Sequence, residues 1–317
     1  MDEFSLISTF FNKTELNAAG GLVDVGIGDD GAVISTPAHS QLVQSIDTLV
    51  ADTHFPAMAD AGLVAFRSLA VSVSDLAAMG ANPHSFFLAL TLPHPNETWL
   101  KSFGDGLARA ARQFHITLAG GDTTRGPLSV TLHVQGFLEH GRALLRSGAS
   151  PGDLVYVSGT LGDASAALPY VLASKPVHSA AEQFLLDRFW QPCARIALGQ
   201  WLRCHGATAA IDVSDGLVAD LGHLAKASRC GVHLARESLP LSGPLKTIHG
   251  DRAAQYAMTG GDDYELCFTW PPAKPLPNTI PCTVHCIGRL SDKADSFVVD
   301  GKPIDSTGVS GYRHFGN

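Results

Sequence analysis

Six aspartates along the chain share a local setting that suits metal binding. Each lies at the edge of an apolar segment with Gly, Ser or Thr within two residues, and the six are Asp30, Asp47, Asp75, Asp122, Asp212 and Asp215. A single Asp in such a setting is more often part of a hairpin turn or a helix cap. Six together favour another interpretation, because Mg2+ prefers oxygen ligands and is usually held by one or two carboxylates and the phosphates of a substrate. The pattern therefore predicts a site where several Mg2+ ions bring phosphorylated substrates together.

Other nucleotide and metal motifs are missing from the sequence. There is no G-x-x-x-x-G-K-[ST] loop and no V-A-I-K, H-R-D and D-F-G set, which argues against the P-loop and protein-kinase folds. There is no H-E-x-x-H, and the Cys/His cluster at 282–286 lacks a zinc spacing and is interpreted as a strand. A Ser/His/Asp triad stays open with 14 histidines, although no G-x-S-x-G elbow supports it.

Composition narrows the class of protein and its partners. A chain of 317 residues is long enough for about two domains. Its net charge of −8, without a basic cluster, predicts that nucleic acid is not a partner. No apolar run approaches the ~20 residues of a membrane span and no leader pattern opens the chain, so we expect a cytoplasmic protein that does not enter membranes. The six cysteines lack paired spacing and are expected to be reduced core thiols.

In the first half, hydrophobic periodicity predicts the elements that must position these aspartates. Expected strands are a pair around a Gly/Asp turn at 23–34, then 42–46, 86–92, about 118–124 and 129–137, and expected helices are 60–80 and 97–114. Asp47 and Asp122 are expected at strand ends, and Asp75 on the first helix. Small, polar and Pro/Gly residues after Arg142 place the domain boundary near 150.

In the second half, a strand at 154–157 is followed by a long helical stretch to about 205, a strand at 209–213 and a helix from Leu217. Val-Ser-Asp recurs at 73–75 and 213–215, and Gly-Gly-Asp at 120–122 and 260–262, both offset by 140 residues. Such echoes can mark duplicated halves. The local patterns disagree, because 60–80 is helical and 209–213 extended, so duplication stays open.

At seven ordered motifs the chain resembles the thiamine-monophosphate kinase family of the aminoimidazole-ribonucleotide-synthetase-like superfamily, over residues 4 to 315. The motifs are Gly-Ile-Gly-Asp-Asp at 26–30, Asp-Thr-Leu-Val at 47–50 with His-Phe at 54–55, Ser-Asp-Leu-Ala-Ala-Met-Gly-Ala at 74–81, Gly-Gly-Asp-Thr-Thr-Arg-Gly at 120–126, Asp-Val-Ser-Asp-Gly-Leu at 212–217, Gly-Gly-Asp-Asp-Tyr-Glu-Leu at 260–266 and Gly-Tyr at 311–312. The resemblance implies an α/β (α+β) fold with an ATP- and Mg2+-binding domain at 1–149 and an α/β domain at 150–317. It also implies a homodimer in which N-terminal sheets of both subunits form a barrel.

The resemblance also implies roles for individual residues. Ligands of Mg2+ would be Asp30, Ser45, the Ile46 backbone, Asp47, Asp75, Asp122, Asp212 and Asp215; ATP would contact Gly121, Asp122, Arg146 and Ser214; thiamine monophosphate would contact His54, Asp263 and Tyr312. The sequence departs from the family pattern at two places. The family often has Glu where Asp263 stands, and Glu-Gly where Ala51-Asp52 stands.

The expected reaction converts ATP and thiamine monophosphate to ADP and thiamine diphosphate. A phosphate monoester has a second pKa of about 6, so its attacking oxygen is largely ionised near pH 7 and needs no general base. A second hypothesis is a sister activity of the superfamily, either ATP-dependent cyclisation in purine synthesis or selenophosphate synthesis. The latter usually needs a reactive Cys or Sec near the N-terminus, and no Cys precedes Cys193. A third is a catalytically idle sensor of nucleotide and Mg2+.

Overall fold

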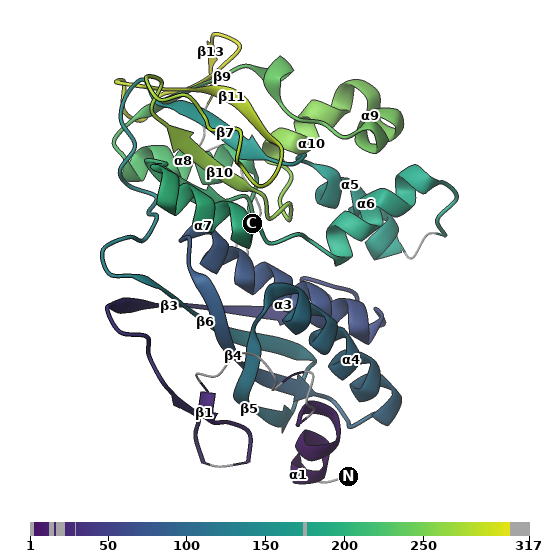
Figure 1. Ribbon diagram of the computed structural model, residues 1–317. Helices are drawn as coiled ribbons and strands as arrows, with labels where there is room; N and C mark the ends of the chain where they lie inside the picture. The colour runs from purple at the N-terminus through teal and green to yellow at the C-terminus, as the bar shows by residue number, and fades with distance from the viewer. Residues whose placement is uncertain (1–2, 13–15, 17–22, 29, 174–175, 305–317) are drawn as a thin grey trace. The chain divides into compact units, whose positions relative to one another are not determined.

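The computed structural model describes residues 3–12, 16, 23–28, 30–173 and 176–304. The chain divides into two compact units (Figure 1). Unit 1 comprises Met1–Leu76 and Ala81–Arg142, and unit 2 comprises Ala77–Gly80 and Ala143–Asn317. The division after Arg142 falls earlier than the 149/150 boundary that the sequence suggested. Both units mix helices and sheet, which confirms the α/β fold class.

Unit 1 is built on a four-stranded sheet in the order β3-β6-β4-β5. The strands are β3 (Ser40–Val50), β6 (Ser129–Glu139), β4 (Asn82–Leu92) and β5 (Thr117–Arg125). Only the β4–β5 pair is parallel. The helices α3 (Ala61–Ala78) and α4 (Glu97–Phe114) lie where the periodicity predicted helices, and Figure 1 shows them beside the sheet.

The pairing register gives this sheet a buried face and an open face. Leu49 pairs with Val130, which pairs with Leu90, and all three are buried. Side chains alternate along a strand, so Ile46, three positions before Leu49 on β3, belongs to the opposite face, where it is 64 % exposed. The same alternation places Ser45 and Asp47 on the face that Leu49 shares.

Strand β3 runs further than the sequence suggested. We expected a strand end at Asp47, and this was wrong; the second expected strand, about 118–124, is confirmed by β5, in which Asp122 lies shortly before the end. The ladder between β3 and β6 continues past Asp47 to Val50, and β5 continues past Asp122 to Arg125. Neighbouring strands keep supplying backbone partners, which a local Asp-Thr pattern cannot reveal.

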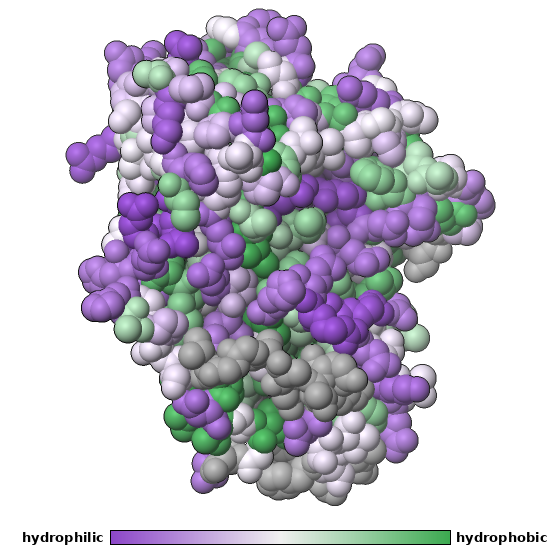
Figure 2. All heavy atoms as spheres, in the orientation of Figure 1, coloured by the Kyte–Doolittle hydropathy of each residue, from purple (hydrophilic) through white to green (hydrophobic). Residues whose placement is uncertain are grey.

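The N-terminal part of unit 1 contains α1 (Glu3–Leu6), the short π-helix η1 (Ile7–Phe11), and an antiparallel hairpin of β1 (Val23–Val25) and β2 (Val33–Ile34). The hairpin confirms the expected strands around a Gly/Asp turn. Val25 and Val33 are exposed, and Figure 2 shows hydrophobic residues, in green, at the surface in this part of unit 1.

Unit 2 contains a seven-stranded sheet in the order β13-β12-β9-β11-β7-β10-β8. Its strands are β7 (Leu154–Ser158), β8 (Ala209–Asp212), β9 (Gly231–Leu234), β10 (Leu266–Trp270), β11 (Val284–Ser291), β12 (Phe297–Val299) and β13 (Lys302–Pro303). The expected strands near 154–157 and 209–213 are confirmed. In this sheet only β9 and β12 pair in parallel.

The helices of unit 2 refine the sequence interpretation. They are α5 (Asp163–Ala173), α6 (Ala180–Trp190), α7 (Ile196–His205), α8 (Leu217–Ala227), η2 (Arg236–Ser238), α9 (Gly243–His249), η3 (Gly250–Arg252) and α10 (Ala253–Thr259). The single long helical stretch expected up to about 205 is three helices. A capping box between Ser179 and Glu182 opens α6, because these two side chains satisfy the free amides of a new helix.

Two sequence expectations need correction, and the structure also bears on the open question of a duplication. Within the described residues, α3 is long and apolar enough to cross a membrane, contrary to the expectation that no run approached that length; 83 % of its apolar window is buried, as in a core helix. Cys204 and Cys286 are exposed, so not every thiol belongs to the core, although Cys230 and Cys267 do. The Val-Ser-Asp echo falls on helix α3 in one copy and on the turn after β8 in the other, which argues against a structural repeat.

The close approach of α3 and α4 generates a stability prediction. A Cβ at Gly106 would lie 2.1 Å from the carbonyl oxygen of Gly62, so Gly106→Ala must push two helices apart. We expect a loss of about 1–3 kcal/mol in unfolding free energy, which a urea titration measures. The control is Gly243→Ala at the start of α9, where nothing lies within 4 Å of the added Cβ. Equal urea midpoints for the two variants would contradict tight packing at Gly106.

Candidate active site

Asp47 and Asp75 form an acidic pair between the sheet and a helix of unit 1. Ser45 and Asp47 are two residues apart on β3 and share one face of the strand. Ser72 and Asp75 are three residues apart on α3 and share one side of the helix. The two faces meet, because the Ser45 hydroxyl donates a hydrogen bond to Asp75 Oδ2.

The electrostatics of this pair fit a bound cation. Burial, and next the negative charge of Asp75, raise the pKa of Asp47 to about 6, against a smaller opposing effect of the Ser72 side chain. Within the described part of the chain, the buried Asp47 Oδ2 has no hydrogen-bond partner. A buried carboxylate oxygen without a partner is costly unless a cation or donor satisfies it. The pair is therefore chemically suited to hold Mg2+, whose ligands are hard oxygens.

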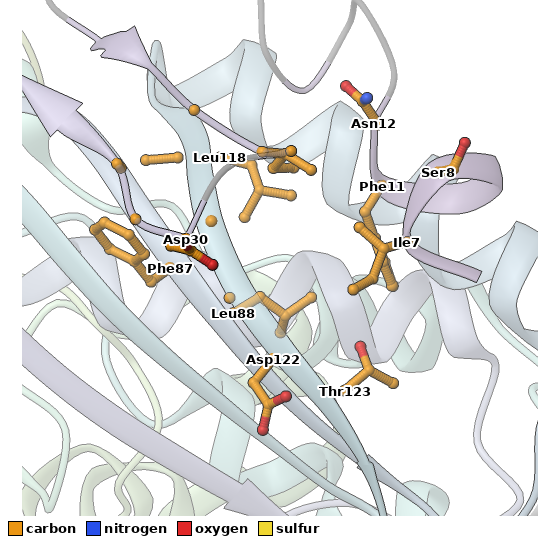
Figure 3. A pocket seen from close by; sticks show the side chains of 18 residues that line it. Ile7, Ser8, Phe11, Asn12, Asp30, Phe87, Leu88, Leu118, Asp122 and Thr123 are labelled. Carbon is orange, nitrogen blue, oxygen red and sulfur yellow. The ribbon is translucent and has the colours of Figure 1, made fainter. Parts of the chain in front are cut away.

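A second group of predicted residues lines a cavity of about 730 Å³ in unit 1. Its wall includes Asp30 from the loop after β1, Gly121 and Asp122 from β5, and residues of η1. In Figure 3 the Asp122 carboxylate points away from Asp30 and from the η1 side chains. Gly121 is required by packing, because a Cβ there would lie 1.9 Å from the carbonyl oxygen of Leu88. Two Gly-Asp motifs that are far apart in sequence thus share one cavity.

In unit 2, the Asp-Val-Ser-Asp-Gly and Gly-Gly-Asp-Asp-Tyr-Glu motifs pair through their backbones. Val213 N–H donates to the Glu265 carbonyl, and Tyr264 N–H donates back to the Val213 carbonyl, both at 2.8 Å. Asp262 N–H donates to the Ser214 carbonyl at the same distance. These bonds extend the pairing of β8 with β10 and hold the two loops together beyond the end of the sheet.

The first of these loops is held from inside by Asp220 in the first turn of α8. Asp220 Oδ2 accepts the backbone N–H groups of Ser214, Asp215 and Gly216, at 3.0, 3.0 and 3.1 Å. Asp220 is 3 % exposed, and burial, followed by the charge of Asp215, raises its pKa to about 7. Asp220 is not among the residues predicted from the sequence; the available signal was an acidic residue three positions after the start of a helix.

Asp263 lies in a buried network of charged groups. It is 1 % exposed, and its Oδ2 accepts the Gly162 N–H at 2.7 Å, while its buried Oδ1 has no partner among the described residues. Burial raises the pKa of Asp263 well above its usual range, against the effect of Arg188. The Asp263 carboxyl is thus enclosed by protein. Its direct contact with substrate, which the resemblance implies, stays a prediction.

The neighbouring Glu265 anchors the second loop. It pairs with Arg195 through two hydrogen bonds, at 2.6 and 2.7 Å, and with Arg188 at 2.8 Å. These guanidinium groups and the Ser158 hydroxyl hold the pKa of Glu265 below its usual value despite burial. Neither arginine lies in a recognisable motif, so the sequence alone does not point to this network.

Arg146 lies on an exposed segment that runs beside β8. Its carbonyl accepts the Ser228 hydroxyl at 3.0 Å, and the preceding Leu145 carbonyl accepts Ala210 N–H. The backbone of Arg146 is thus held beside the strand that ends at Asp212. An exposed Arg at that place can donate two parallel hydrogen bonds to a phosphate.

The loop after β3 fixes the orientation of His54. Its Nδ1 accepts the Val50 N–H at 3.0 Å, so the neutral ring carries its proton on Nε2. Asp52 adopts a left-handed φ of 61°, and its Oδ1 accepts the Ala57 N–H at 3.0 Å. Asp suits this position, where the resemblance led us to expect Gly, because it tolerates the left-handed conformation and its side chain ties the loop together.

The structure groups the predicted residues without gathering them all. Ser45, Asp47 and Asp75 form one group, Asp30, Gly121 and Asp122 a second, and Asp212, Ser214 and Asp215 a third. Ile46 directs its side chain to the open face. Its predicted role as a ligand concerns the backbone carbonyl, not that side chain. In the part of the chain that is described, no three His, Cys, Asp or Glu residues form a group that could hold a metal ion. Tyr312 lies outside the described residues.

The acidic pair yields a test of metal binding by stability. With a chelator at pH 8, we expect Asp75→Asn to melt at a higher temperature than the native protein, because one of two neighbouring negative charges is gone. Added Mg2+ should then raise the melting temperature of the native protein more than that of the variant. Asp292→Asn, in an exposed bend, is the control. A Mg2+ response of equal size in Asp75→Asn would contradict the assignment.

Comparison with known proteins identifies the family. The domain family described as AIR synthase related protein, N-terminal domain, matches residues 28–138. The chain is 42 % identical to the thiamine-monophosphate kinase of Haemophilus influenzae, over 99 % of this chain and 98 % of that protein.

Solved structures agree with this comparison. The thiamine-monophosphate kinase of Stenotrophomonas maltophilia K279a has a TM-score of 0.84 and 42 % identity, over 89 % of this chain and 92 % of that one. A structure described as AaThiL complexed with AMPPCP and TMP has a TM-score of 0.81 and 33 % identity, over 91 % and 92 %. With similarity of this extent in both sequence and fold, the chain belongs to the thiamine-monophosphate kinase family.

Proposed function

We propose that the chain transfers the γ-phosphoryl group of ATP to the phosphate of thiamine monophosphate, giving ADP and thiamine diphosphate, with several Mg2+ ions. The observation that carries the proposal is the likeness to a family member complexed with AMPPCP and TMP. The acidic groups support it, because two phosphorylated substrates repel each other strongly at low dielectric. Cations held by carboxylates offset that repulsion.

The proposed magnesium ligands are the three acidic groups described above. Asp47, Asp75 and the Ser45 hydroxyl belong to one, with the Ile46 carbonyl beside them. Asp30 and Asp122 belong to the second, and Asp212 and Asp215 to the third. When bound, Mg2+ would supply positive charge between the phosphates, and the carboxylates of these three groups would determine where that charge lies.

The transfer itself needs little covalent chemistry from the protein. The acceptor phosphate has a second pKa of about 6 and is ionised near neutral pH, so no side chain has to remove a proton. The work of the protein is alignment and charge neutralisation. We therefore propose direct in-line transfer without a phosphoenzyme; labelled protein trapped after incubation with γ-32P-ATP would contradict this.

The proposed substrate contacts follow the family pattern. Gly121, Asp122, Ser214 and Arg146 would contact ATP, with the Arg146 fork on a phosphate. For thiamine monophosphate the proposed residues are His54, Asp263 and Tyr312. The bond from Val50 N–H to His54 Nδ1 fixes the orientation of the proposed His54 side chain.

We propose a homodimer formed through the open face of the sheet in unit 1. Leu42 and Ile46 are exposed on β3, at 45 % and 64 %. Large exposed apolar side chains on one sheet face favour an interface. A second copy of the same sheet would cover this face and complete the proposed barrel. The proposed location is the cytoplasm, and the net charge of −8 supports a protein without nucleic-acid or membrane partners.

An ADP-release assay over a panel of phosphorylated acceptors tests the function. We expect ADP release that depends on thiamine monophosphate and on Mg2+ in excess over ATP. Asp→Asn at 30, 75 or 212 should abolish turnover while circular dichroism shows a folded protein, because each variant removes a charged ligand. ADP release with another acceptor alone would indicate a sister activity, and none with any acceptor would indicate a sensor. Near-native rates in the Asn variants would contradict the magnesium assignment.

The Asp52 loop gives a second prediction. Asp52→Ala should raise the KM for thiamine monophosphate several-fold, because a left-handed conformation costs Ala about 1–2 kcal/mol and the bond to Ala57 N–H is lost. Asp52→Gly keeps the conformation and should raise KM less. The KM for ATP is the internal control, and an equal change in both KM values would show that the loop does not act on the acceptor.

A further inference from the structure

The turn between β8 and α8 has its backbone donors already occupied. The backbone amides of residues 214–216 lie directly before the first turn of α8. Free N–H groups at such a helix N-terminus commonly bind a phosphate. Here all three donate to one oxygen of Asp220, within 3.0 to 3.1 Å. The carboxylate of the chain itself thus takes the place that an anionic ligand would otherwise occupy.

The surrounding packing leaves this turn little freedom. Gly216 has a φ of 119°, and a Cβ there would lie 3.0 Å from the backbone of Thr259. On the other side, a Cβ at Gly261 would lie 2.4 Å from the Ser214 carbonyl oxygen. The second loop therefore presses on the turn from outside, and Asp220 holds it from inside.

The occupied amides limit how the turn can meet a ligand. The N–H groups of 214–216 are all directed at Asp220, so none of them is left to donate to a nucleotide. The side chains of the turn that can meet nucleotide or metal are the Ser214 hydroxyl and the Asp215 carboxylate. Both side chains are partly exposed, while Asp220 is buried beneath them. Their direction depends on the backbone that Asp220 holds.

We infer that Asp220 is a positioning residue, which orients Ser214 and Asp215 for Mg2+ and nucleotide without contacting either. The inference rests on the proposed function of these two side chains. Residues that orient metal ligands in this way typically change metal affinity or activity 10- to 100-fold when replaced. Asp220 is thus expected to affect the magnesium requirement more than the affinity for the phosphate acceptor.

The experiment combines hydrogen exchange with Mg2+ titration of the full chain. In Asp220→Ala, the amides of 214–216 should exchange faster, and the Mg2+ concentration for half-maximal ADP release should rise on the order of tenfold. The KM for thiamine monophosphate should stay near the native value. Asp220→Asn retains an acceptor oxygen and should fall between native and Ala, which keeps the test valid if the Ala variant does not fold.

Asp153→Asn is the matched control. Asp153 is also buried in unit 2, and it accepts the Ser150 N–H and the Thr208 hydroxyl. Thr208 directly precedes β8, whereas the turn follows the other end of that strand. It should lower stability without changing exchange at 214–216 or the Mg2+ requirement. Unchanged exchange in Asp220→Ala, or faster exchange with a native Mg2+ requirement, would overturn the inference. Exchange is measurable without turnover, so an inactive native protein would count against the proposed function alone.

Discussion

Repulsion between confined carboxylates is the constraint on which this structure depends. Asp47 and Asp75 are held on the edge strand β3 and on the core helix α3, and neither element can move without loss of packed apolar contacts. Burial first, and then the negative charge of Asp75, disfavour the ionised form of Asp47 and raise its pKa. A fold that maintains such a pair favours states in which a cation is present, since binding to the folded state alone stabilises it.

Backbone geometry, more than side-chain chemistry, determines where the other acidic motifs lie. Gly121 lets β5 approach Leu88 closely, and Gly261 lets one loop of unit 2 rest on Ser214. Neither approach leaves room for a Cβ. The glycines of these motifs are therefore required for close packing. The same packing determines where the adjacent aspartates lie.

Buried polar networks complete the positioning. In unit 2, Glu265 is fixed by Arg195 and Arg188, and Asp220 by three amides, so both loops are tied to the core through groups that have lost most of their water. Breaking such a network by removing one partner leaves an uncompensated buried group, which is costly. Loops held in this way can keep ligand side chains in place without large contacts of their own.

The sequence by itself determined the chemistry and much of the local structure. Recurrent Asp beside Gly, Ser or Thr indicated metal and phosphate binding, and apolar periodicity located α3 and α4 closely, because side-chain spacing on one helix is a local property. Only the tertiary structure decided that Asp47 lies within a strand, since a strand ends where its neighbours stop pairing. It alone showed Asp220 beneath the turn and Asp263 enclosed by charges, because burial and hydrogen-bond partners arise from residues distant in sequence.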